Sequence, residues 1–102
     1  MPKTEAQIQG EISKLLKSAG FSPVYKIMTA SVNGVPDIFA LWHGHSVHIE
    51  VKKHEFAKHS PEQECMIDII NDNGGIAFFS HSKSDCVKKL KARGIDIFGG
   101  MI

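Results

Sequence analysis

The amino-acid sequence predicts a single α/β or α+β domain in which helices pack against a mixed β-sheet. The chain has 102 residues, which is the size of one domain. Its apolar residues recur at helical spacing in some segments and alternate with polar residues in others. These segments follow the order helix, strand, strand, strand, helix, strand, helix, and this interleaving favours a sheet flanked by helices.

The first helix is expected over residues 4–19. Thr4 followed by Gln7 has the spacing of a capping box, in which each side chain accepts a hydrogen bond from the other residue's backbone. Gly20 ends the helical spacing. The apolar residues that recur between these two signals are Ile8, Ile12, Leu15, Leu16 and Ala19.

Three strands are expected next. Residues 24–29 are apolar and β-branched, and turn-forming residues separate them from a second strand over residues 37–42. In the third strand, Val47, Ile49 and Val51 alternate with polar residues, which indicates one buried face. The tight connection between the last two strands predicts a hairpin.

The second half of the chain should add a helix, a strand and a helix. Ser60, Pro61 and Gln63 form a dense helix-start signal. Residues 76–79 are wholly apolar, as in a strand covered on both faces. A last helix should open at Ser82 and end near Gly94. The tail, residues 95–102, suits either a short edge strand or an arm that packs on a partner.

The register of the hairpin decides which side chains meet. If the turn is centred on residues 44–45, Asp37 lies opposite Lys52 and Phe39 lies opposite Glu50. This register gathers the strongly apolar side chains of both strands on one face. It also gathers Asp37, Glu50 and Lys52 on the other face.

Two carboxylates beside a lysine suggest a site for a divalent metal ion. Two carboxylates in an apolar neighbourhood repel each other, and a divalent cation with oxygen ligands, Mg²⁺ or Mn²⁺, relieves the repulsion. The metal lowers the pKa of a bound water and polarises a phosphoryl oxygen, while an adjacent lysine orients the water. The pattern therefore points to phosphodiester hydrolysis without an organic cofactor. The alternative is a surface salt bridge between Lys52 and either acid.

The arrangement Pro36-Asp37, twelve residues, then Glu50-Val51-Lys52 resembles the signature of the PD-(D/E)XK nuclease superfamily. The segments GVPD, EVK and SPEQ, in this order, resemble more closely the VRR-NUC family, in its small stand-alone phage and bacterial type. The resemblance implies a restriction-endonuclease-like αβββαβ core over about residues 4–80, within a single nuclease domain at residues 1–102.

The resemblance also implies roles for individual residues. Asp37 and Glu50 would ligate the metal together with the main-chain carbonyl of Val51, and Lys52 would position or activate the attacking water. Glu11 matches the acidic residue of the family's first helix, which holds a metal or its water shell.

Two of the implied roles have ordinary structural alternatives. Glu11 flanks the buried stripe of the first helix, where it would equally pair with Lys14 or Lys17. Gln63 matches the glutamine of the family's SPxQ segment and belongs to the inward-facing stripe of its helix. It would also cap that helix through Ser60.

DNA contacts are expected just after the catalytic strand. The side chains there can meet phosphates, and the helix start offers backbone N–H groups, although a solvated loop is the alternative. The candidates are Lys53, Lys58, His59 and Ser60. For the basic last helix, DNA contact and ordinary solvation both remain open. Three further histidines, His43, His45 and His48, are expected to be solvated turn residues rather than a metal cluster.

These observations predict a metal-dependent DNA endonuclease, and the resemblance to the small family members implies that it selects branched DNA such as Holliday junctions. The alternatives are a flap-directed or less selective nuclease of the same family, or a non-catalytic nucleic-acid-binding module. Symmetric incision of a four-way junction requires two sites related by a two-fold axis, so a homodimer is expected. Residues 24–28 and the tail are candidate interface segments, and the alternative places them in the core.

The composition of the chain excludes several classes of protein and site. The formal net charge is 12 − 11 = +1, which excludes binding through bulk positive charge but leaves room for a local cationic groove. The two cysteines, Cys65 and Cys86, fit neither a disulfide framework nor a zinc pattern. No signal core or long apolar run is present in the sequence, so a cytoplasmic protein without a membrane span is expected.

Overall fold

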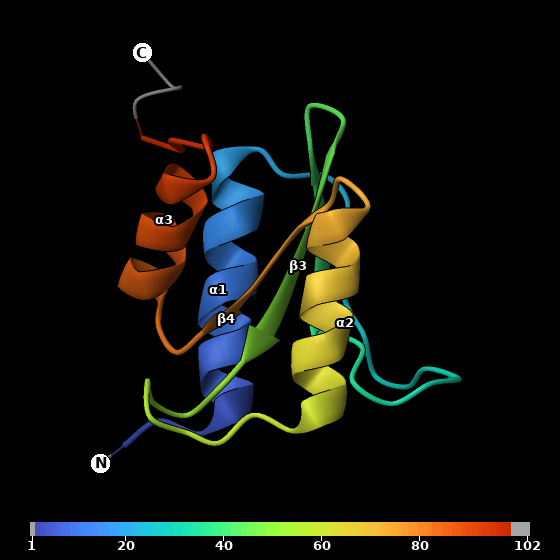
Figure 1. The fold of residues 1–102 in the computed structure, drawn as a ribbon. Helices are drawn as coiled ribbons and strands as arrows, with labels where there is room; N and C mark the ends of the chain where they lie inside the picture. Colours follow the sequence, from blue (N-terminus) through green and yellow to red (C-terminus); the bar gives the residue numbers. More distant parts are fainter. Residues whose placement is uncertain (1, 99–102) are drawn as a thin grey trace.

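The computed structural model describes residues 2–98, and its elements follow the predicted order (Figure 1). The helices are α1 (Glu5–Ala19), α2 (Pro61–Asp72) and α3 (Lys83–Ala92). The strands are β1 (Val24–Lys26), β2 (Ile38–Trp42), β3 (His45–Val51) and β4 (Ile76–Ser80). The predicted mixed sheet flanked by helices is confirmed.

The sheet has the order β1-β2-β3-β4. The first two pairs are antiparallel, whereas β4 lies parallel to β3 because α2 carries the chain back across the sheet. Helices α1 and α3 cover one face, and α2 packs on the other against β4 (Figure 1). The start of α1, the end of β3 and the start of α2 all lie at the same end of the molecule.

The core lies between the sheet and the layer of α1 and α3. The stripe of α1 that the sequence predicts is buried there, as are the apolar residues of the hairpin. Both predicted capping boxes form, one at Thr4 and one at Ser60. Local signals therefore place α1 and α2 within one residue of their predicted starts.

Strand β1 is shorter than predicted. It ends at Lys26, and the backbone N–H of Ile27 makes one more hydrogen bond, to the carbonyl of Asp37 at 2.7 Å. Continuing the β1–β2 register brings the chain opposite Pro36. Because proline has no N–H, it cannot extend the ladder, and residues 27–36 form a loop.

The hairpin turn is also placed differently from the prediction. Trp42 pairs with His45, so the turn residues are His43 and Gly44 rather than Gly44 and His45. Both have positive φ, 45° and 85°, as in a type I′ turn. This turn type matches the twist of the flanking strands and favours glycine at its second position, which Gly44 supplies.

The new turn shifts the β2–β3 register by two residues, and the predicted register was wrong. Phe39 lies opposite His48 instead of Glu50. Extending the ladder by one residue sets Asp37 opposite Glu50 rather than Lys52. Side chains on a strand alternate between the two faces of the sheet, so a shift of two residues leaves every side chain on its predicted face. Asp37 and Glu50 therefore still lie on the same face.

The described part of the tail belongs to the chain's own core. Ile95 and Ile97 are buried against it, so this part is neither an edge strand nor an arm for a partner. Residues 99–102 lie outside the described residues. Cys65 is exposed and Cys86 is buried, both as free thiols, and burial raises the pKa of Cys86 to about 12. Within residues 2–98, no helix has the length and apolar character needed to cross a membrane.

Gly34 brings the loop before β2 into backbone contact with the start of α2. Its φ is 88°, and a Cβ there would lie 2.6 Å from the carbonyl carbon of Glu62. We expect Gly34→Ala to lower the free energy of unfolding by about 1–3 kcal/mol, because it adds both overlap and an unfavourable φ. Thermal or urea unfolding would measure the change.

Gly10 provides the matched control for this substitution. It lies within α1, and a Cβ there meets no atom within 4 Å. Gly10→Ala should therefore raise the free energy of unfolding by about 0.5–1 kcal/mol through helix propensity. Equal effects of the two substitutions would contradict the close packing assigned to Gly34.

Candidate active site

Asp37 and Glu50 lie side by side at the ends of two neighbouring strands. Asp37 directly precedes β2, and Glu50 is the last residue but one of β3. The backbone N–H of Val51 donates a hydrogen bond to Oδ2 of Asp37 at 2.8 Å, which fixes that carboxylate at the end of β3. The Glu50 side chain is buried, with 5% of the residue exposed. The predicted pair of carboxylates is thus present.

Gln63 links this pair to Lys52. Its Nε2 donates to Oε2 of Glu50 at 3.2 Å, and its Oε1 accepts from Nζ of Lys52 at 2.7 Å. The same Oε1 accepts from the backbone N–H of Ser60 at 3.1 Å, which completes the helix cap. Gln63 therefore caps α2, as predicted, and the same amide contacts Glu50 and Lys52.

Lys52 lies beside the acids without pairing with them. Among the described residues, it makes no ion pair with Asp37 or Glu50, so the alternative of a surface salt bridge is wrong. Its Nζ lies 6.0 Å from the ring centroid of Phe79, on β4. The ammonium is held by an uncharged amide on α2 and remains available to a further group.

The electrostatics of Glu50 are unusual for a carboxylic acid. Burial, the negative charge of Asp37 and a hydrogen bond between the two carboxyl groups raise the pKa of Glu50 to about 8. The charge of Lys52 opposes this rise only in part. The site thus resists holding two ionised carboxylates at once, and a bound cation relieves this cost.

The raised pKa makes the stability of the protein depend on pH. In the unfolded chain Glu50 titrates near 4.5, so between about 4.5 and about 8 only the unfolded state has released the proton. We therefore expect the free energy of unfolding to fall as the pH rises through this window, by about 1.4 kcal/mol per pKa unit. Thermal melting in EDTA at pH 5 and pH 8 would measure this loss.

Glu50→Gln should remove most of the pH dependence, because the amide is uncharged at every pH in the window. Asp68→Asn, at an exposed position of α2, is the matched control and should keep the wild-type slope. A slope in Glu50→Gln equal to that of the wild type would show that another group titrates.

Glu11 is not brought into this cluster. Its carboxylate pairs with Nζ of Lys3 at 2.8 Å, and this contact lowers the pKa of Glu11. It lines a separate hollow with Lys83 and Phe98. The partner is therefore Lys3, and neither Lys14 nor Lys17 as the sequence suggested.

A different acid of α1 acts on the cluster. The charge of Glu5, in the first turn of α1, contributes to the raised pKa of Glu50. The sequence carries a signal for it, because Glu5, Ile8 and Ile12 are spaced by three and four residues and so share one face of the helix. Glu5 continues the buried stripe toward the site end of the molecule, whereas Glu11 lies beside that stripe.

The candidate DNA contacts fall into two groups. Lys53 and Lys58 are exposed on the loop that follows Lys52. His59 is turned inward, with its ring stacked on Phe79 at a centroid distance of 3.5 Å. The hydroxyl and the backbone N–H of Ser60 both bond to Gln63, so Ser60 serves the helix cap.

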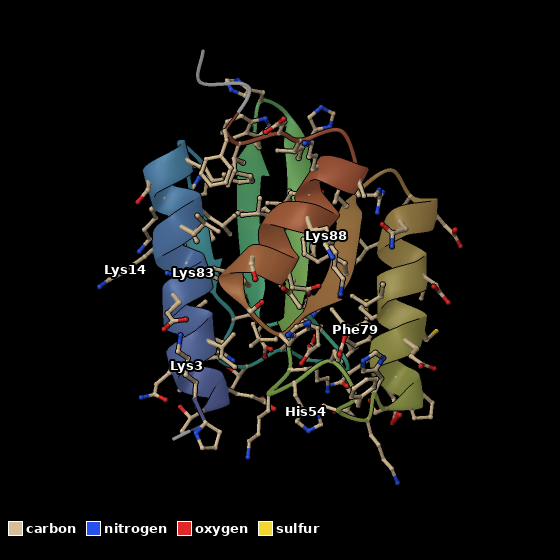
Figure 2. All side chains as sticks on the ribbon, turned by 90° about the vertical axis from the view of Figure 1, so that its left-hand side faces the viewer. Lys3, Lys14, His54, Phe79, Lys83 and Lys88 are labelled. Atoms are coloured by element: carbon tan, nitrogen blue, oxygen red, sulfur yellow. The ribbon has the colours of Figure 1, made fainter. Side chains whose placement is uncertain are left out.

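A hollow of about 270 Å³ opens beside Lys52. Figure 2 shows its surroundings, with Phe79 below α3 and His54 on the loop at the same end of the molecule. The residues that line it are Lys52, His54, Glu55, His59, Phe79, Ser80, His81, Asp85 and Lys89. On its α3 side, Asp85 pairs with Lys89 at 3.1 Å, so one cation of the basic last helix is already neutralised.

The three hairpin histidines do not form a metal site. His43 and His45 are exposed at the turn, as predicted. His48 differs, because it lies half-buried on the sheet with its ring 5.2 Å from that of Phe39, and burial lowers its pKa.

The donor set at Asp37 and Glu50 fits a hard divalent cation. Among residues 2–98, no group of three or more His, Cys, Asp or Glu side chains is spaced to enclose a metal. Mg²⁺, however, binds through one or two carboxylates and retains several water ligands. Two adjacent carboxyl groups therefore suit Mg²⁺ and not a metal that needs a full protein cage.

Comparison with known proteins finds solved structures that share this fold. No family model and no curated protein matches the sequence. A solved structure described as "VRR_NUC domain" matches with a TM-score of 0.74 and 26% identity, over 89% of this chain and 97% of that chain. Another, described as "VRR_NUC domain protein", has a TM-score of 0.71 and 18% identity, over 89% of this chain and 88% of that one.

The structure that is 18% identical shows a shared fold alone. The structure that is 26% identical also shows some likeness in sequence. Each likeness spans 89% of this chain and so covers most of the domain. The protein shares the fold of these VRR-NUC domain structures, and this likeness supports a nuclease of the PD-(D/E)XK type.

Proposed function

We propose that the protein is a Mg²⁺- or Mn²⁺-dependent endonuclease that hydrolyses phosphodiester bonds in DNA, with a preference for branched structures. The observation that carries the proposal is the pair of adjacent acids, Asp37 and Glu50, which Gln63 links to the ammonium of Lys52. Paired carboxylates next to an ammonium suit the chemistry of phosphoryl transfer.

Asp37 and Glu50 would hold the metal. The carbonyl of Val51 is a further ligand, because the N–H and C=O of one strand residue point to the same side, and this N–H already bonds to Asp37. Glu5 lies on the helix that starts at the same end, where it suits the water shell of the ion. When bound, the metal supplies a water of lowered pKa and a counter-charge for a phosphoryl oxygen.

Lys52 would orient the attacking water and offset charge that develops on the phosphate. Its ammonium has three donors, of which one bonds to Gln63, so others can reach water or a phosphate oxygen. Gln63 is a positioning residue, since it holds Lys52 and Glu50 in one geometry through a single amide. Lys53 and Lys58 would contact phosphates away from the reacting bond.

The test is cleavage by the purified protein of a four-way junction, a flap, a linear duplex and a single strand, each with Mg²⁺, Mn²⁺ or EDTA. We expect cleavage with either metal, none in EDTA, and the highest rate on a branched substrate. Equal rates on all four DNAs would favour the less selective nuclease. Binding without cleavage under every condition would favour the non-catalytic module.

We further expect a homodimer, since one domain with one site cuts one strand at a time. Among the candidate interface residues, Val24 packs on the core, whereas Tyr25 and Met28 are exposed. Light scattering at micromolar concentration should give twice the 11.2 kDa mass of the chain. Met28→Asp should shift the mass to that of one chain.

The branched-DNA preference depends on this dimer. If the wild type stays a monomer on junction DNA, the resolvase-like reading fails and the flap-directed nuclease takes its place. The proposal of a metal site at Asp37 and Glu50 does not depend on that outcome.

A further inference from the structure

The loop between β3 and α2 is anchored in the candidate active site at both ends. At its start, the backbone N–H of Lys52 donates to the carbonyl of Ser80 at 2.9 Å, and the Lys52 side chain bonds to Gln63. At its end, Ser60 caps α2 through the same glutamine. The intervening residues 53–59 therefore project from a fixed base next to Lys52.

The tip of this loop carries an exposed aromatic ring. The N–H of Ala57 donates to the carbonyl of His54 at 3.1 Å, which closes a turn with Glu55 and Phe56 as its central residues. Phe56 is 83% exposed, the most of any large apolar side chain in the described chain. Burial of this ring therefore contributes little to the stability of the fold.

The surroundings of Phe56 match a nucleic-acid strand. Lys53, His54 and Lys58 are exposed on the same loop, and all can bear positive charge. A single strand presents phosphates together with free faces of its bases, and aromatic rings among lysines bind both. A fully paired duplex differs, because its bases already stack on one another and would have to be extracted at a cost.

We propose that Phe56 stacks on an unpaired base near the scissile phosphate, so that the loop selects DNA with unpaired bases at the cleavage site. Phe56 lies four positions after Lys52 in the chain, which limits their Cα distance to about 14 Å, a span of a few nucleotides. The inference rests on the proposed nuclease function and adds a specificity-determining residue to it.

The experiment measures binding in EDTA. The probes are a duplex with a single-stranded flap that carries 2-aminopurine beside the branch, and a fully paired duplex of the same length. Phe56→Ala should weaken binding to the flap by about 5- to 150-fold, the range measured for one stacked base, and abolish quenching of 2-aminopurine. Binding to the paired duplex should change less than about twofold, because lysine contacts to phosphate remain.

Three variants make the result specific to the ring. Phe56→Trp should retain affinity and quenching, whereas Phe56→Leu, apolar but without a π face, should behave as Phe56→Ala does. Phe98→Ala removes another exposed ring, which is 62% exposed and lies in the tail after α3, and this variant should bind as the wild type does. All variants should melt at the wild-type temperature.

Several outcomes would overturn the inference. Equal weakening on both DNAs, or wild-type binding by Phe56→Leu, would exclude stacking. A change in oligomeric mass in Phe56→Ala would assign the ring to a contact between copies of the chain. A wild type that neither binds nor cuts any DNA would instead refute the proposed function, and that result is distinct from the others.

Discussion

Asp37→Asn and Glu50→Gln are each expected to lower cleavage by roughly three orders of magnitude or more. A bound metal supplies several kcal/mol of transition-state stabilisation, and each ~1.4 kcal/mol is a factor of ten in rate. Either amide weakens metal binding by removing one of the two carboxylates that lie together. Single-turnover rates on the preferred DNA, with Mg²⁺ titrated from zero to saturation, would measure the loss.

The two variants should remain folded. An Asn side-chain oxygen can still accept from the N–H of Val51, and a Gln at position 50 can still accept from Gln63. In EDTA at pH 8 both should melt at or above the wild-type temperature, since each removes one of two repelling charges. This stability separates lost catalysis from lost structure.

The control for the acid pair is Asp68→Asn, which removes an exposed carboxylate from α2. It should cleave as the wild type does. Full activity in Asp37→Asn or Glu50→Gln, or wild-type rates in EDTA, would exclude the proposed metal site.

Lys52→Ala is expected to lower the single-turnover rate about 10²- to 10³-fold and to change DNA affinity little. A group that stabilises charge only as it develops acts chiefly in the transition state. Its Nζ is held by Gln63 beside the acids, and not on the exposed loop where phosphate contacts are expected. Rates at saturating protein, set beside binding in EDTA, would separate the two effects.

Lys53→Ala and Lys58→Ala are the matched substitutions. Both lysines are exposed on the loop. They should weaken binding several-fold, reduce its salt dependence by about one released counterion each, and leave the rate at saturation unchanged. If Lys52→Ala instead lost affinity and kept its rate, Lys52 would be a phosphate contact and the catalytic role would be wrong.

Much of the fold can be predicted from the sequence because its signals are local. Thr4 with Gln7 and Ser60 with Gln63 satisfy backbone groups within one turn, so helix starts follow from residues three apart. The hairpin faces follow from a period of two, which is a property of each strand alone. The motif residues Asp37, Glu50 and Lys52 thus lie on or directly beside the adjoining strands β2 and β3.

The register of β2 and β3 could not be predicted from the local sequence pattern. A shift of two residues leaves the alternation unchanged, so the apolar pattern cannot separate the two registers. The turn decides between them, since His43 and Gly44 adopt the positive φ values that a type I′ turn requires. The consequence is chemical, because the residue opposite Asp37 becomes an acid rather than a lysine.

The sequence alone determined the order of elements, the faces of the strands and the identity of the acid pair, because caps and periodicity depend on neighbours in the chain. Only the tertiary structure decided that Glu5 rather than Glu11 acts on Glu50, and that one glutamine joins α2 to both Lys52 and Glu50. It also decided the pKa of Glu50, which depends on burial and on a charge thirteen residues away in sequence. Distances between elements set these properties, and packing of the whole chain sets those distances.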